Sequence, residues 1–209
     1  VTSGATNNGT VTVASTGTYN AALNITANSP SVSGYGFVFA NIKVYGGTNT
    51  SGTLLKTYTT TSASFNMSDL NAYYGNIYVY ATWNASTVSY SISYDLDGGS
   101  VTGNPTSYTI ETATFTLKNP TKNGYNFAGW TGTGLSSAST SVSIAKGSTG
   151  NRSYKATWTP ITYTISYDLD GGSVATANPT SYTIETATFT LNNPTKTGYT
   201  FAGWTGSNG

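Results

Sequence analysis

The stretch GYNFAGW at residues 124–130 recurs as GYTFAGW at residues 198–204, and this repetition decides how the chain is organised. Two longer stretches recur with it: YDLDGGSV at 94–101 and 167–174, and NPTSYTIETATFTL at 104–117 and 178–191. Such self-similarity is the signature of repeated structural units. We therefore predict two copies of one small domain, repeat 1 over residues 87–159 and repeat 2 over residues 160–209.

Each copy alternates apolar and polar residues with a period of two, which is typical of strands with one buried and one exposed face. In repeat 1, Tyr90, Ile92 and Tyr94 alternate with polar residues, and the Asp-Gly-Gly sequence at 97–99 predicts a turn. Residues 108–110 and 113–117 continue the alternation and predict two further strands. Trp130 and Trp158 each end an alternating face, so both rings are predicted to be buried.

The composition favours an all-β protein and excludes several functions. Charged residues make up only 7% of the 209 residues, the formal net charge is +1, and there is no His and no Cys. The usual zinc sites, thiol chemistry and the Ser-His-Asp triad are therefore excluded. Nothing resembles the basic patch that binds nucleic acid, and no apolar run is long enough to span a membrane. We expect no enzymatic activity and no cofactor, and the charge-poor surface is typical of extracellular β-proteins.

The repeated motifs resemble a known family. The Asp-x-Asp-Gly-Gly turn, the Asn-Pro-Thr-x-x-Gly-Tyr-x-Phe-x-Gly-Trp stretch and a closing Tyr-x-Ala-x-Trp strand are similar to the Listeria–Bacteroides, or internalin B-type, repeat of bacterial surface proteins. The resemblance covers residues 88–209. It implies a β-grasp-like fold and a role in cell-surface stalks and adhesins, with no catalytic residues.

The N-terminal third has a different pattern. Residues 28–83 weakly resemble an immunoglobulin-like or fibronectin type III sandwich. The full expectation is an all-β chain of tandem small domains: N-terminal strands at 1–27, a β-sandwich at 28–86 and two β-grasp-like repeats at 87–159 and 160–209.

Repeat 2 lacks the last strands of repeat 1. Counterparts are missing for five apolar residues: Val142, Ile144, Tyr154, Ala156 and Trp158. Burying each stabilises a domain by about 1.5–3 kcal/mol, so their loss forfeits roughly 8–15 kcal/mol. A typical domain has a total stability of about 5–15 kcal/mol.

The start of the chain has the pattern of the missing strands. Residues 10–14 (TVTVA) are similar to residues 141–145 (SVSIA), and residues 17–25 continue with the right side-chain phase. We therefore expect head-to-tail polymers of the chain, in which N-terminal strands of one copy complete repeat 2 of the next by strand addition. The expected donor residues are Val11, Val13, Ala21, Leu23 and Ile25. The expected acceptor residues are Ile165, Tyr167, Tyr182, Ile184, Phe189, Phe201 and Trp204. The alternative is that the chain is a fragment cut within repeat 2, and that residues 8–27 are the first strands of the N-terminal sandwich itself.

Other polar residues carry weaker signals. The pairs Asp95 with Asp97 and Asp168 with Asp170 could bind Ca²⁺, but two carboxylates are few for such a site, and local turn bonding is the favoured interpretation. Glu111 and Glu185 are interpreted as structural salt-bridge partners on strand edges. Asn49 and Asn84 lie in Asn-x-Ser/Thr sequences and are candidate glycosylation sites in exposed loops.

The function predicted from the sequence is therefore mechanical. We expect an extracellular structural protein, a cell-surface stalk or filament subunit whose partners are copies of itself. The alternative is a monomeric adhesin that binds a glycan or a matrix ligand on a host surface.

Overall fold

The computed structural model of the chain describes residues 2–15, 22–70 and 75–206, and nearly all of its regular structure is β-strand. This confirms the predicted all-β class. The one helical element among these residues is the 3-10 turn η1 (Met67–Leu70). No helix in the described ranges is long and apolar enough to cross a membrane.

The chain divides into two compact units. Unit 1 combines residues 1–91, 107–114 and 145–151, and unit 2 combines residues 92–106, 115–144 and 152–209. The predicted domain boundaries near residues 87 and 160 stay predictions.

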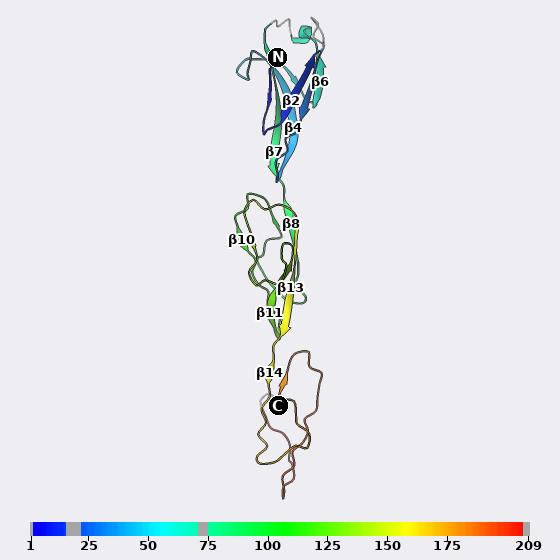
Figure 1. Cartoon of the computed structure of the whole chain (residues 1–209), viewed down its shortest axis with the longest axis vertical. Coiled ribbons are helices and arrows are strands. Elements are labelled where there is room, and N and C mark those ends of the chain that lie inside the picture. Colours follow the sequence, from blue (N-terminus) through cyan, green and yellow to red (C-terminus); the bar gives the residue numbers. More distant parts are fainter. Residues whose placement is uncertain (1, 16–21, 71–74, 207–209) are drawn as a thin grey trace. The chain divides into compact units, whose positions relative to one another are not determined.

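The N-terminal part of unit 1 is a sandwich of two sheets (Figure 1). One sheet has the order β1 (Thr2–Ala5), β7 (Ile77–Thr87), β4 (Tyr35–Gly46) and β5 (Thr53–Tyr58). The other has the order β2 (Thr10–Ser15), β3 (Leu23–Asn28) and β6 (Ser62–Phe65). Alternate residues of both sheets point into one core that contains Ile25, Ile42, Val44, Val79 and Trp83. Two faces with a period of two thus bury their apolar residues against each other.

Repeat 1 contains a four-stranded sheet with the order β11 (Tyr125–Gly132), β13 (Arg152–Pro160), β8 (Tyr90–Asp95) and β9 (Ser107–Tyr108). A second, two-stranded sheet joins β10 (Phe115–Thr116) to β12 (Ser143–Ile144). The Trp130 ring is fully buried, as predicted. Trp158 is only half-buried, and its Nε1–H donates to the carbonyl of Leu96 at 3.2 Å.

Repeat 2 has much less regular structure. Its described strands are β14 (Tyr163–Thr164) and β15 (Ser181–Tyr182), which pair with each other. The Asp-Gly-Gly turn and the Gly-Tyr turn nevertheless keep the hydrogen bonds of repeat 1, since Gly172 N–H donates to Leu169 and Tyr199 N–H donates to Lys196. Local sequence therefore fixes the turns even where the sheet is short.

Candidate subunit interface

Repeat 2 exposes apolar side chains that repeat 1 buries. Tyr108 is 3% exposed, whereas its counterpart Tyr182 is 42% exposed. Leu117 is buried, whereas Leu191 is half-buried. The local sequences around these positions are identical, so the difference comes from the segments that cover them.

The covering segments of repeat 1 are its last strands. Phe115 of β10 pairs with Ile144 of β12, and Leu117 N–H donates to the carbonyl of Val142 at 2.8 Å. Residues 161–206 contain no counterparts of β12 and β13. Among residues 161–206, the apolar side chains of repeat 2 are therefore not covered by the strands that cover their counterparts in repeat 1.

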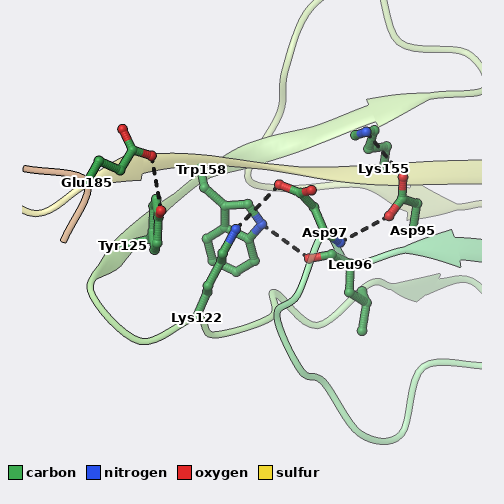
Figure 2. A network of polar contacts seen from close by, with 8 residues as sticks. All are labelled: Asp95, Leu96, Asp97, Lys122, Tyr125, Lys155, Trp158 and Glu185. Atoms are coloured by element: carbon green, nitrogen blue, oxygen red, sulfur yellow. Dashed lines mark hydrogen bonds and ion pairs between the residues drawn. The ribbon is translucent and has the colours of Figure 1, made fainter. Parts of the chain in front are cut away.

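A groove of about 310 Å³ lies in repeat 2 where repeat 1 holds a tryptophan. It is lined by residues that include Leu169, Gly172, Lys196, Phe201 and Trp204. In repeat 1 the counterparts of the first four, Leu96, Gly99, Lys122 and Phe127, all lie against Trp158. Figure 2 shows Lys122 over the Trp158 ring and the hydrogen bond from the indole nitrogen to the Leu96 carbonyl. The groove is thus lined by the same residue types that surround the Trp158 indole in repeat 1. The Leu169 carbonyl corresponds to the Leu96 carbonyl, which accepts the hydrogen bond of that indole.

The structure places the predicted acceptor residues in two groups. Tyr182, Ile184, Phe189 and Phe201 are exposed. Ile165, Tyr167 and Trp204 are half-buried, and the Trp204 ring packs against both Tyr167 and Phe201. Phe201 and Trp204 are the members of the predicted set that line the groove.

The structure places the predicted donor residues in the N-terminal sandwich. Val11 and Val13 of β2 pair with Ala27 and Ile25 of β3, and β3 also pairs with β6. Leu23 and Ile25 are buried in the sandwich core, and Val11 and Val13 pack against it. Ala21 lies outside the described residues. Within one chain the structure therefore has the alternative arrangement, and donation of these strands to a second copy stays a prediction.

The Asp-x-Asp-Gly-Gly turns are held by local bonds (Figure 2). The Asp95 carboxylate accepts from the backbone N–H of Asp97 at 3.0 Å and lies 3.2 Å from Lys155 Nζ. The backbone N–H of Asp97 and the nearby Lys155 together lower the pKa of Asp95. In repeat 2, Asp168 accepts from Asp170 N–H at 2.9 Å. No group of three or more potential metal ligands occurs in the described part of the chain.

The candidate glycosylation sites and the two glutamates differ in part from their predicted environments. Asn84 is exposed but lies within β7 rather than in a loop, whereas Asn49 is exposed and its side chain accepts from Ser51 N–H. In the part of the chain that the structure describes, the ion pairs involve neither Glu111 nor Glu185, contrary to the salt bridges that the sequence suggested. Each accepts a hydrogen bond from a tyrosine instead, Tyr35 at 3.1 Å and Tyr125 at 3.0 Å.

These Tyr–Glu contacts were missed by sequence reasoning. The signal was present, because the Gly-Tyr-x-Phe sequence at 124–127 also occurs at 34–37, outside the recognised repeats. Both contacts lie within single units, Tyr35 with Glu111 in unit 1 and Tyr125 with Glu185 in unit 2.

Comparison with known protein families identifies the repeats. The family model of the Listeria-Bacteroides repeat domain matches residues 90–154 and 163–209, which together are more than half of the chain. No curated protein and no solved structure matches the chain.

Proposed function

This chain belongs to the Listeria-Bacteroides repeat domain family, and we propose that it is an extracellular structural protein, a surface stalk or filament subunit. Repeats of this family are typical of extracellular, surface-associated proteins. The observation that supports a mechanical role is the open apolar face of repeat 2. Tyr182 and Phe189 are exposed there in a sequence whose other copy buries or half-buries the same positions.

The proposed assembly is head to tail. Strands at the N-terminus of one copy cover the open face of repeat 2 in the next, which is a heterologous contact and can generate filaments. Val11 and Val13 have the spacing of Val142 and Ile144, which supports this pairing.

The same strands also pair within their own sheet, so the assembly is an exchange between two arrangements. To leave the sandwich, β3 must give up the burial of Leu23 and Ile25. Burial of each such side chain contributes about 1.5–3 kcal/mol, so the exchange requires comparable burial on repeat 2.

A reversible lock tests the exchange. Thr26 of β3 and Ser62 of β6 are register partners with exposed side chains, and the natural chain has no cysteine. In the double variant Thr26→Cys/Ser62→Cys, a disulfide should hold β3 in its own sheet. We expect oxidised protein to stay monomeric and reduced protein to form polymers, as measured by sedimentation velocity.

The matched control is Lys43→Cys/Thr57→Cys, which joins β4 to β5 and leaves β3 free. This variant should polymerise in both redox states. Polymers that form equally well when β3 is locked would contradict strand exchange. Monomers in every state would favour the alternative function, a surface arm that binds a glycan or matrix ligand.

A further inference from the structure

One turn occurs three times in the chain, each time with the sequence Gly-Tyr-x-Phe. The tyrosine N–H donates to the carbonyl three residues earlier at 3.1 Å in all three: Tyr35 to Val32, Tyr125 to Lys122 and Tyr199 to Lys196. The preceding glycines have φ of +80, +77 and +78°. This is the third position of a type II turn, which favours glycine.

A second loop occurs twice, with the sequence Thr-Ile-Glu-Thr at 109–112 and 183–186. In both copies the last threonine N–H donates to the first threonine carbonyl at 3.1 Å. The first threonine hydroxyl also accepts from the glutamate N–H at 3.2 Å in both. These bonds within the loop hold its shape. In repeat 1 the loop begins directly after β9, so the strand predicted at 108–110 ends at Tyr108.

The turn and the loop meet in the same way at two places. In unit 2, Tyr125 donates to Glu185 and Ile184 lies so close to Gly124 that an added Cβ would be 2.7 Å from the isoleucine Cδ1. In unit 1, Tyr35 donates to Glu111, and a Cβ at Gly34 would overlap Ile110. The linker contributes a third shared bond, since Val88 N–H donates to Gly34 and Ile161 N–H to Gly124, both at 2.9 Å.

We propose that the Gly-Tyr turn and the Ile-Glu loop form a reusable joint between successive domains, and that Gly198 and Tyr199 are a free half of it that accepts the Ile-Glu loop of a further repeat. The proposal goes beyond the stalk function and does not rest on strand exchange. It requires a repeat with an Ile-Glu loop after repeat 2, whereas strand exchange places the sandwich of a second copy there, so the two are tested separately.

The third turn has the surface that the proposal requires. Tyr199 is 72% exposed, and nothing lies within 4 Å of the Cβ position of Gly198. Lys196 Nζ lies 4.5 Å from the Tyr199 ring centroid, as Lys122 Nζ lies 4.4 Å from that of Tyr125. The occupied turn at residues 122–125 shows which groups fit, namely an isoleucine side chain on the glycine and a carboxylate on the hydroxyl.

The first experiment uses the full chain and measures tyrosine nitration by tetranitromethane, mapped by mass spectrometry. A hydroxyl that donates to a carboxylate resists ionisation, so Tyr35 and Tyr125 should react more slowly than Tyr199. Glu185→Gln should accelerate nitration of Tyr125 alone, and Glu111→Gln that of Tyr35 alone.

Two glycine variants separate the joint from local strain. Gly124→Val and Gly198→Val place a side chain at nearly the same φ, but only Gly124 has an isoleucine against it. We expect Gly124→Val to make Tyr125 as reactive as Tyr199, and Gly198→Val to leave Tyr35 and Tyr125 protected. Equal reactivity of Tyr125 and Tyr199 in the unmodified chain would overturn the proposal.

The second experiment supplies the missing half. Appending residues 133–209 after Gly206 completes repeat 2 with the end of repeat 1 and adds another Ile-Glu loop. Tyr199 should then become as protected as Tyr125, and Gly198→Val should remove this protection. The fluorescence of Trp204 shows whether repeat 2 is completed, because its ring should then be buried. If Trp204 is buried and Tyr199 is still reactive in the extended chain, the proposal is overturned. This outcome does not depend on whether the chain forms filaments.

Discussion

Tyr125 and Tyr199 stand in nearly identical sequences, yet among the described residues only Tyr125 bonds a carboxylate, that of Glu185. Glu185 lies 60 residues further along the chain than Tyr125. Tyr108 and Tyr182 are a second such pair, one buried and one exposed. At this scale the environment of a residue is set by segments distant in sequence.

The Tyr125–Glu185 contact should be lost in alkaline solution. The hydrogen bond to Glu185 raises the pKa of the Tyr125 hydroxyl above its ordinary value near 10, and burial and the charges of Glu185 and Asp97 act in the same direction. A group whose pKa is raised by a contact stabilises it fully below the ordinary pKa, and this stabilisation is lost as the pH rises through the raised value. The facing cation is Lys122.

An NMR titration of the Tyr125 ring checks this expectation. Its pKa should lie above 10 in the natural chain and fall towards 10 in Glu185→Gln, which removes the negative charge. Identical titration curves for the two proteins would contradict the contact.

Calcium should have no effect on stability. Asp95 and Asp168 accept from backbone N–H groups of their own turns, and Lys155, Lys122 and Lys196 pair with Asp95, Asp97 and Asp170. These bonds need no ion. Addition of a calcium chelator should leave the melting temperature unchanged, and a fall of several degrees would show that the turns bind metal.

At the scale of strands, alternation in the sequence predicted several elements well. Residues 90–95 form β8, and the strand closing in Ala-Thr-Trp forms β13. Alternation failed at 108–110, because the hydroxyls of Thr109 and Thr112 bond the local backbone and form a turn. It could not assign residues 10–14 either, since a Thr-Val-Thr-Val strand fits the edge of any half-buried sheet.

The Gly-Tyr turn shows the limit of recognition by repeats. Its first copy lies at 34–37, in a sandwich that the family model does not match. The sequence signal for it was four residues long, and its partner Glu111 lies 76 residues away. Only the fold brings the two together.

Substitution of equivalent tryptophans should have unequal effects. Trp130 is fully buried, whereas Trp204 is half-buried. Trp130→Ala should therefore destabilise its domain by about 3–5 kcal/mol, and Trp204→Ala by less than half of that. Urea unfolding followed by circular dichroism measures both, and equal losses would mean that repeat 2 has a closed core.

The missing strands should bind when supplied separately. A peptide of residues 132–160 carries β12 and β13, which cover the counterpart face in repeat 1. We expect it to bind the full chain, shift Trp204 fluorescence and block association between chains. A peptide with Trp158→Ala, which leaves the groove of about 310 Å³ empty, should bind at least tenfold more weakly. Equal binding of the two peptides would contradict the match between groove and indole.

At the scale of the whole molecule, the tandem repeats are the feature that supports the proposed role as a structural subunit. The all-β class and the family could be predicted from the sequence, because the repeated motifs carry both. The pairing of the N-terminal strands could not, because the same apolar pattern satisfies an intramolecular and an intermolecular sheet. Mass under native conditions distinguishes these two cases.

Sedimentation velocity of the full chain over a wide range of concentrations is therefore the most direct test of head-to-tail assembly. The chain has a mass of 21.7 kDa. We predict a ladder of species at whole-number multiples of this mass, growing with concentration, together with protection of Trp204 from a soluble quencher. A single 21.7 kDa species at every concentration, with Trp204 accessible throughout, would contradict the proposed assembly.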